Sequence, residues 1–291
     1  MKKFKAVLAF TVLACALTAC GGKKAENVET EPASTSAASD HEGKEDENAD
    51  VVALPDEFEA EYFEGIVTSV KGNRLTLKNE EKTMTFDITN AEIAGDSALL
   101  TGCDAEAEYA KVDGDVYPAD MVTVLMDVEQ QAASENRDPY IYGVLQFADI
   151  NDITIIDDSG VERTFDNQMS RTVSFNELKA GDPVYVTYCG TVFDEEEERG
   201  ESEFTEPIAI KVVAADAVES EDAKANYFIG TVDSAYQNGI VSVANDIATF
   251  EVTADESIMN GINEEDEVKV YYDGALAGIS VEATKIEKVN G

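Results

Sequence analysis

The sequence predicts an all-β protein built from three tandem modules behind a disordered N-terminal tether, and three observations lead to this prediction. Three landmarks recur in the same order: an aromatic-rich triplet before a glycine, a Thr-Phe-acid triplet, and a strand-like run ending in tyrosine. Short runs alternate apolar and polar residues, which is typical of half-buried strands. Residues 21–50 contain no Leu, Ile, Phe, Tyr or Met, so this stretch has almost nothing to bury.

The landmarks keep a near-constant spacing in all three copies. They are the glycines Gly65, Gly143 and Gly230, the phenylalanines Phe86, Phe165 and Phe250, and the tyrosines Tyr109, Tyr188 and Tyr272. The separations from glycine to phenylalanine are 21, 22 and 20 residues, and those from phenylalanine to tyrosine are 23, 23 and 22. We therefore expect homologous β-barrel modules at residues 58–126, 138–214 and 226–291.

Each module shows three strands, a longer connection, and then two strands. Alternation marks strands at residues 74–78, 84–88 and 267–271, turn residues separate strands at 71–73, 157–160 and 237–239, and closing strands are expected at 121–125, 207–213 and 279–286. The connection before the fourth strand has a helical pattern in the second copy. Ser174 followed by Glu177 fits a capping box and Gly181 fits a helix stop, so we expect a short helix there.

Five strands with a short helix or turn between strands 3 and 4 resemble the OB-fold barrel, so the sequence predicts three tandem five-stranded OB-like barrels. The glycine of strand 1 suits the bend or bulge that such a strand needs. An SH3-like barrel is the competing interpretation. The polar linkers at 126–138 and 214–226 could each form a short helix, and neither has an apolar face wide enough to demand packing. We expect the modules to be arranged like beads on a moderately stiff string.

The first 19 residues read as a lipoprotein signal peptide. A basic start precedes an apolar run, Ala6 to Ala19, that is too short to span a bilayer comfortably. The run ends in Leu17-Thr18-Ala19-Cys20, which resembles the lipobox of bacterial lipoproteins. The resemblance implies cleavage before Cys20, lipidation of Cys20, and an anchor on the extracytoplasmic face of the cell membrane. A secretory signal without lipid is the alternative. Residues 20–57, which follow the signal peptide, are expected to form a disordered acidic tether.

The net charge of −40 argues against nucleic acid as a partner, because phosphate contacts require Lys or Arg. Loss of residues 1–19 would remove three lysines and no acid, giving −43. A protein or glycan partner at the cell envelope stays open. Small OB-like barrels behind a lipobox also resemble a type of bacterial lipoprotein module, through the turn at Leu178 to Val184.

The residues of the modules do not suit most classes of catalysis. The single histidine, His41, lies in the tether, so no imidazole is expected beside a nucleophile. Cys103 and Cys189 fall at non-equivalent positions and are expected as buried or half-buried strand residues. Sugar stacking is an alternative to core packing for six aromatic residues near the module starts: Tyr62, Phe63, Tyr140, Tyr142, Tyr227 and Phe228.

The second module carries an insertion after Tyr188 that is rich in acids. It contains Asp194, Glu195, Glu196, Glu197 and Glu198, a candidate metal site for which Ca²⁺ is the fitting cation. A solvated hairpin tip or a contact with a partner would explain the same charges. No other cofactor is expected.

The sequence thus predicts a non-enzymatic binding or scaffolding protein at the membrane, with an unidentified ligand. Two alternatives stay open: a Ca²⁺-binding surface protein, and a hydrolase that uses a pair of carboxylates.

Overall fold

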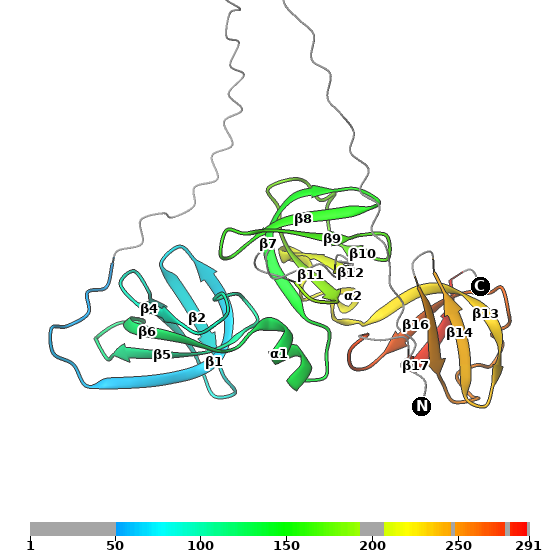
Figure 1. Ribbon diagram of the computed structural model, residues 1–291, viewed down its shortest axis with the longest axis horizontal. Helices are drawn as coiled ribbons and strands as arrows, with labels where there is room; N and C mark the ends of the chain where they lie inside the picture. Colours follow the sequence, from blue (N-terminus) through cyan, green and yellow to red (C-terminus); the bar gives the residue numbers. More distant parts are fainter. Residues whose placement is uncertain (1–50, 193–206, 246–247, 277–279, 290–291) are drawn as a thin grey trace, which may run out of the picture. The chain divides into compact units, whose positions relative to one another are not determined.

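The same strand circuit forms in each of the three modules of the computed structural model (Figure 1). The structure describes residues 51–192, 207–245, 248–276 and 280–289. Module 1 contains β1 (Ala60–Lys71), β2 (Arg74–Lys78), β3 (Thr83–Asp87), β4 (Glu92–Ala94), β5 (Asp104–Ala110) and β6 (Val116–Met126). Module 2 contains β7 (Tyr140–Ala148), β8 (Asp152–Asp157), β9 (Glu162–Asp166), β10 (Arg171–Val173), β11 (Pro183–Cys189) and β12 (Ile208–Ala214). Module 3 contains β13 (Tyr227–Gln237), β14 (Ile240–Ala244), β15 (Thr249–Thr253), β16 (Glu267–Tyr272) and β17 (Ser280–Lys288).

In module 3 the five strands close in the order β13-β14-β15-β17-β16, and β15 pairs with β17 in parallel. Modules 1 and 2 repeat this circuit, with parallel closure between β3 and β6 and between β9 and β12. Their extra strands β4 and β10 add to the closing strand in parallel. A five-stranded barrel with this order is OB-like, so the predicted fold class is confirmed.

The glycine of strand 1 is required by close approach to strand 2. A Cβ atom would lie 2.7 Å from the Lys78 carbonyl oxygen at Gly65, 2.5 Å from that of Ile156 at Gly143, and 2.7 Å from that of Ala244 at Gly230. Two residues later each strand has a β-bulge, where the register with strand 2 shifts by one residue. The expected bend of strand 1 therefore combines a glycine with a bulge.

The recurring phenylalanine and tyrosine meet inside the barrels of modules 1 and 2, and in module 3 Phe228 contacts both of them. The ring centroids of Phe86 and Tyr109 lie 5.2 Å apart, and those of Phe165 and Tyr188 lie 5.3 Å apart. In module 3 Phe228 lies 4.6 Å from Phe250, and all of these rings are buried. Such aromatic contacts stabilise a core beyond the area that the rings bury.

The helix expected at residues 174–181 does not form; the segment is a bend followed by a turn. The backbone N–H of Lys179 donates to Asp182 Oδ2 at 2.8 Å, and Gly181 has a φ of 96°. The N–H of Gly181 also donates to the Leu145 carbonyl at 2.8 Å, which fastens the turn to β7. These contacts outweigh the local helix signals, because a helix this short has a costly nucleus.

Both linkers contain a short helix, α1 (Val128–Ser134) and α2 (Glu221–Lys224), and a 3₁₀ helix lies at Ala215–Ala217. The expectation that neither linker packs is wrong for α1. Its Val128 and Ala132 are buried, because the Asp127–Gln130 capping box fixes the first turn and directs one face inward.

Candidate binding face on the second module

The residues singled out as lipidation and metal sites, Cys20 and Asp194 to Glu198, lie outside the described residues. Within the described ranges, no group of three or more His, Cys, Asp or Glu side chains could hold a metal ion. The same part of the chain contains no helix long and apolar enough to cross a membrane.

The two cysteines of the modules are unpaired. Cys103 is buried just before β5 and Cys189 is half-buried in β11, and burial raises the pKa of each thiol to about 11. A thiol with so high a pKa is a poor nucleophile at neutral pH.

The aromatic residues near the module starts divide into two groups. Phe63 and Phe228 are buried in the barrel cores, which confirms core packing for these two. Tyr227 is buried outside the barrel core, against Arg171 of module 2 and Asp222 of the second linker. Tyr140 and Tyr142 are half-buried on β7. Tyr62 is 59% exposed, and the negative charge of Glu108 raises its pKa.

The carboxyls with raised pKa are held by structural hydrogen bonds. Burial raises the pKa of Asp158, which accepts from the N–H and the hydroxyl of Thr101 at 3.0 and 2.6 Å. Burial also raises the pKa of Asp138, which accepts from Tyr272 and Leu276. Burial and the negative charge of Glu64 raise the pKa of Asp104. None of the three lines a cavity described below.

The strand-1 bulges place one equivalent residue of each module on the outer face of strands 1, 2 and 3. The partner of this residue on strand 2 lies between two buried residues and therefore faces outward. Because directly opposed residues share a face, the residue that follows each bulge also faces outward. The three rows are Ser69, Thr76 and Thr85 in module 1, Phe147, Thr154 and Thr164 in module 2, and Ser234, Ser242 and Glu251 in module 3. Module 2 alone has a large apolar residue at this position.

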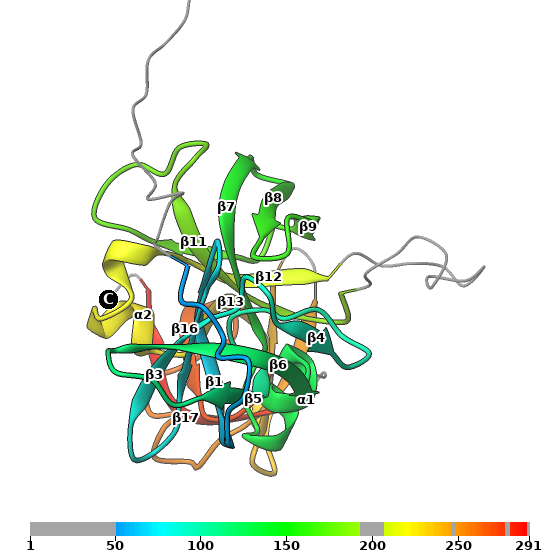
Figure 2. The same cartoon turned by 90° about the vertical axis from the view of Figure 1, so that its left-hand side faces the viewer.

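The outer face of β7, β8 and β9, which lie side by side in both views, is here called the β7–β9 face (Figures 1 and 2). Phe147 is 52% exposed on it. The hydroxyls of Thr154 and Thr164 lie 3.0 Å apart next to Phe147. One row along the strands, Val144 and Ile156 are half-buried and Glu162 is exposed. In the other direction Asp152 pairs with Asp166.

Phe147 is not among the residues singled out from the sequence, although the sequence contains a signal for it. The residue lies four positions after the strand-1 glycine Gly143, and the same count from Gly65 and Gly230 reaches Ser69 and Ser234. An aromatic side chain at one position of three in aligned repeats indicates a role other than core packing. Ile150, at the tip of the same hairpin, is 78% exposed.

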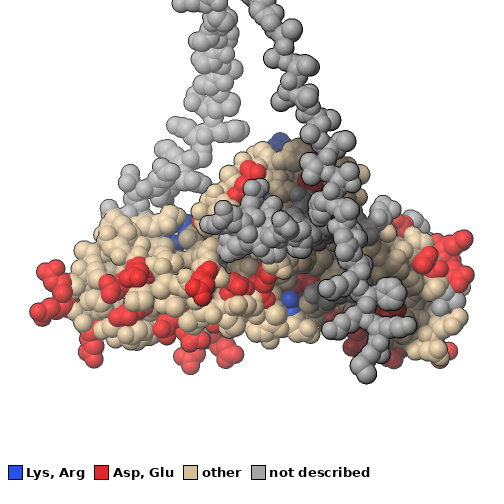
Figure 3. Space-filling model, in the orientation of Figure 1, with Lys and Arg blue, Asp and Glu red and all other residues tan. Residues whose placement is uncertain are grey.

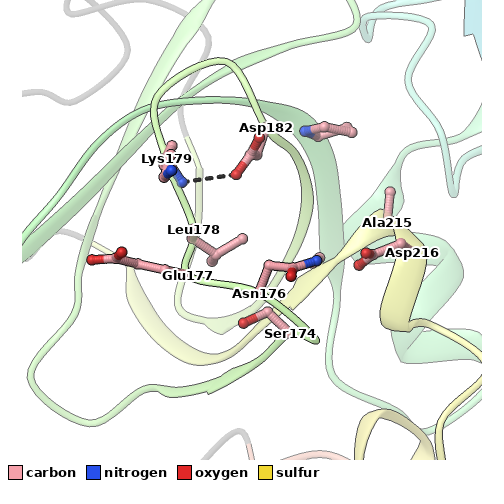
Figure 4. Close-up of a pocket in the computed structure, with 10 residues that line it drawn as sticks. Ser174, Asn176, Glu177, Leu178, Lys179, Asp182, Ala215 and Asp216 are labelled. Carbon is pink, nitrogen blue, oxygen red and sulfur yellow. Dashed lines mark hydrogen bonds between the residues drawn. The ribbon is translucent and has the colours of Figure 1, made fainter.

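Two cavities, the first in module 2 and the second lined by residues of modules 2 and 3, are better explained as consequences of the fold. The first, of about 370 Å³, is lined by Leu178, Lys179, Asp182 and Asp216 among others (Figure 4). Its Lys179–Asp182 hydrogen bond belongs to a turn that module 3 repeats, where the Asn263 N–H donates to Asp266 at 2.7 Å. A contact shared by two modules forms a turn and does not identify a ligand site.

The second cavity, of about 440 Å³, includes Arg171 and Tyr227 in its lining. The guanidinium of Arg171 lies 3.9 Å from the ring centroid of Tyr227 and donates to the carbonyls of Asp222 and Ala225. Its cation–π contact and its hydrogen bonds hold the second linker.

Carboxylates are spread over the visible face of the molecule, where few Lys or Arg side chains are seen (Figure 3). Arg163, the basic residue of β9, lies on the opposite, inner side of these strands, where it is buried and donates to Asp157 at 2.8 Å. The face therefore combines an aromatic platform, hydroxyls and carboxylates.

No family model matches the chain. No curated protein matches it either. Among solved structures, the chain is similar to Drosophila Unr CSD456, with 12% identity, coverage of 79% of this chain and 98% of that chain, and a TM-score of 0.21. It is also similar to a multidomain protein with nucleic acid binding domains from Streptococcus pneumoniae TIGR4, with 9% identity, coverage of 76% and 72%, and a TM-score of 0.16.

The expectation that nucleic acid is not a partner is contradicted by the second of these structures, which is described as having nucleic acid binding domains. The expectation used the net charge of the whole chain. A net charge does not describe the side chains of one face, so it does not exclude a class of polymer.

Proposed function

We propose that the chain is a membrane-anchored extracytoplasmic lipoprotein that acts as a non-enzymatic binding protein through the β7–β9 face of module 2. One observation carries the binding function. Phe147 is 52% exposed on a hydrogen-bonded strand, where both other modules have serine. An exposed aromatic ring on a rigid strand is costly to keep in water and favourable for a ligand that covers it.

The anchor is supported by the residues before the modules. Cys20 follows Leu17-Thr18-Ala19 and a short apolar run, and no strongly apolar stretch separates it from module 1. Metabolic labelling with a palmitate analogue tests this part. We expect the wild-type chain and Cys15→Ala to be labelled, and Cys20→Ala to be unlabelled. Equal labelling of Cys20→Ala would exclude the anchor.

Binding is tested in cells by photo-crosslinking on the full chain. A photoreactive phenylalanine analogue is placed at position 147 and, as a matched control, at the equivalent position 234. We expect adducts from position 147 in excess over those from position 234, because only the first lies on the proposed surface. Equal yields from the two positions would overturn the assignment of the binding face.

A further inference from the structure

We infer that the β7–β9 face binds the rings of an uncharged oligosaccharide, with Phe147 as the stacking platform. The inference rests on the proposed function, since it names the ligand class of the same face. It is carried by the kinds of side chain that lie around Phe147 and by the register that brings them together.

The platform is apolar and already ordered. Phe147 pairs with Thr154 in the β-ladder, and Val144 and Ile156 lie half-buried in the next row of the same face. A sugar ring presents one face of C–H groups, which packs on an aromatic ring by burying apolar surface. Because the strand is held by backbone hydrogen bonds, little conformational entropy is lost on binding.

The polar groups beside the platform match the hydroxyls of a sugar. Thr154 and Thr164 each offer one donor and two acceptor positions, and their mutual hydrogen bond uses only part of this capacity. Asp152 and Asp166 on one side and Glu162 on the other are acceptors for hydroxyl donors. Hydrogen bonds to charged acceptors are the stronger kind.

The charge of the face is consistent with this ligand. Three carboxylates lie within one row of Thr154 and Thr164. An uncharged ring brings no like charge to them, so the net charge of −40 does not oppose its approach.

The test is a calorimetric titration of the full chain in detergent with hexasaccharides of glucose and of N-acetylglucosamine. Phe147→Ser installs the residue that modules 1 and 3 carry, so we expect it to fold and to weaken binding at least about tenfold. Phe175→Ser is the matched control, because Phe175 is 69% exposed in the connection before β11. We expect its affinity to equal that of the wild type.

Thr154→Val gives a second readout at constant shape. It removes one hydroxyl, and we expect it to weaken binding by about fivefold. Thermal unfolding of each variant separates loss of binding from loss of the fold.

Three outcomes would overturn the inference. Absence of binding by either hexasaccharide to the wild type removes the ligand class, while the crosslinking result decides separately whether the face binds anything. Binding of a twelve-nucleotide oligothymidylate, lost in Phe147→Ser, would keep the proposed function and replace the sugar by nucleic acid. Sugar binding unchanged in Phe147→Ser would overturn the site itself.

Discussion

Asp87, at the end of β3, has the most strongly stabilised carboxylate of module 1. It accepts hydrogen bonds from the backbone N–H groups of Val52 and Thr89 at 2.6 and 2.9 Å, and it pairs with Arg74 at 2.6 Å. Burial by itself would raise its pKa, but the hydrogen bonds from Thr89 and Val52 and the contact with Arg74 outweigh burial and lower the pKa to about 2.

This shift gives stability a defined dependence on pH. The folded pKa of Asp87 lies below its ordinary value of 3.8, so the unfolded chain binds the proton more tightly. The stabilisation of about 2 kcal/mol is therefore present above pH 4 and is lost as pH falls through about 2. We expect Asp87→Asn to lower the free energy of unfolding by about this amount at pH 7, measured by urea denaturation, and to differ little from the wild type near pH 2.

Asp120→Asn is the control for this variant. Asp120 is exposed on β6, and its substitution makes the same change in charge. We expect it to alter stability by less than about 0.5 kcal/mol at every pH. A gap between Asp87→Asn and the wild type that stays constant from pH 7 to pH 2 would contradict the role given to the ionised carboxylate.

Among the elements, the turn before strand 4 shows how strictly the modules repeat. Gly102, Gly181 and Glu265 occupy its left-handed position, with φ values of 101°, 96° and 68°. The backbone N–H of each residue donates to a carbonyl oxygen of strand 1. The acceptors are Val67, Leu145 and Val232, at 2.8, 2.8 and 2.9 Å respectively. In module 3 a glutamate therefore adopts a conformation that favours glycine.

We expect Glu265→Gly to raise the free energy of unfolding by about 0.5–1 kcal/mol. Relief of the left-handed backbone strain stabilises the folded chain by more than the added flexibility of glycine stabilises the unfolded chain. Glu264→Gly, one residue earlier, removes the same charge at a residue whose φ is not positive, and we expect it to be destabilising. Urea denaturation of both variants measures the difference. A Glu265→Gly chain no more stable than Glu264→Gly would exclude the strain.

The recurrence of glycine, phenylalanine and tyrosine allowed the strands to be predicted from the sequence. These residues form the cores and the close strand contacts that the barrel requires. The helix expected at Ser174 to Gly181 failed for a physical reason. A capping box is a local signal, whereas the hydrogen bond from the Gly181 N–H to the Leu145 carbonyl joins residues 36 apart in the chain. Phe147 was missed because its exposure depends on a bulge register, which alternation alone does not reveal.

At the scale of the whole molecule, carboxylates from the first linker are bound by two modules. Glu129 of α1 accepts from the hydroxyl of Tyr188 at 3.3 Å and from the N–H of Val192 at 2.8 Å, both in module 2. The tyrosine and the N–H are four residues apart. The first linker is therefore hydrogen-bonded to the barrel of module 2 and is not a free connection between modules.

Asp138 repeats this contact with module 3. Its carboxylate accepts from the hydroxyl of Tyr272 at 2.9 Å and from the N–H of Leu276, again four residues later, at 2.6 Å. Tyr272 lies 134 residues along the chain from Asp138, and both side chains are buried. The prediction of modules arranged like beads on a string did not include this contact, because sequence patterns do not reveal a contact between residues this far apart in the chain.

We expect Asp138→Asn to weaken the tie between the linker and module 3. An amide offers one acceptor oxygen in place of two, so a buried donor is left unsatisfied, at a cost of about 2 kcal/mol. The measurement is hydrogen exchange on the full chain, where the Leu276 N–H should exchange about tenfold faster. Tyr272→Phe removes only the hydroxyl and should leave Leu276 bound to Asp138. Because both variants act on one carboxylate, their effects on unfolding should be non-additive. Additive effects, or Leu276 exchange as slow as in Asp120→Asn, would mean that module 3 is held independently of the first linker.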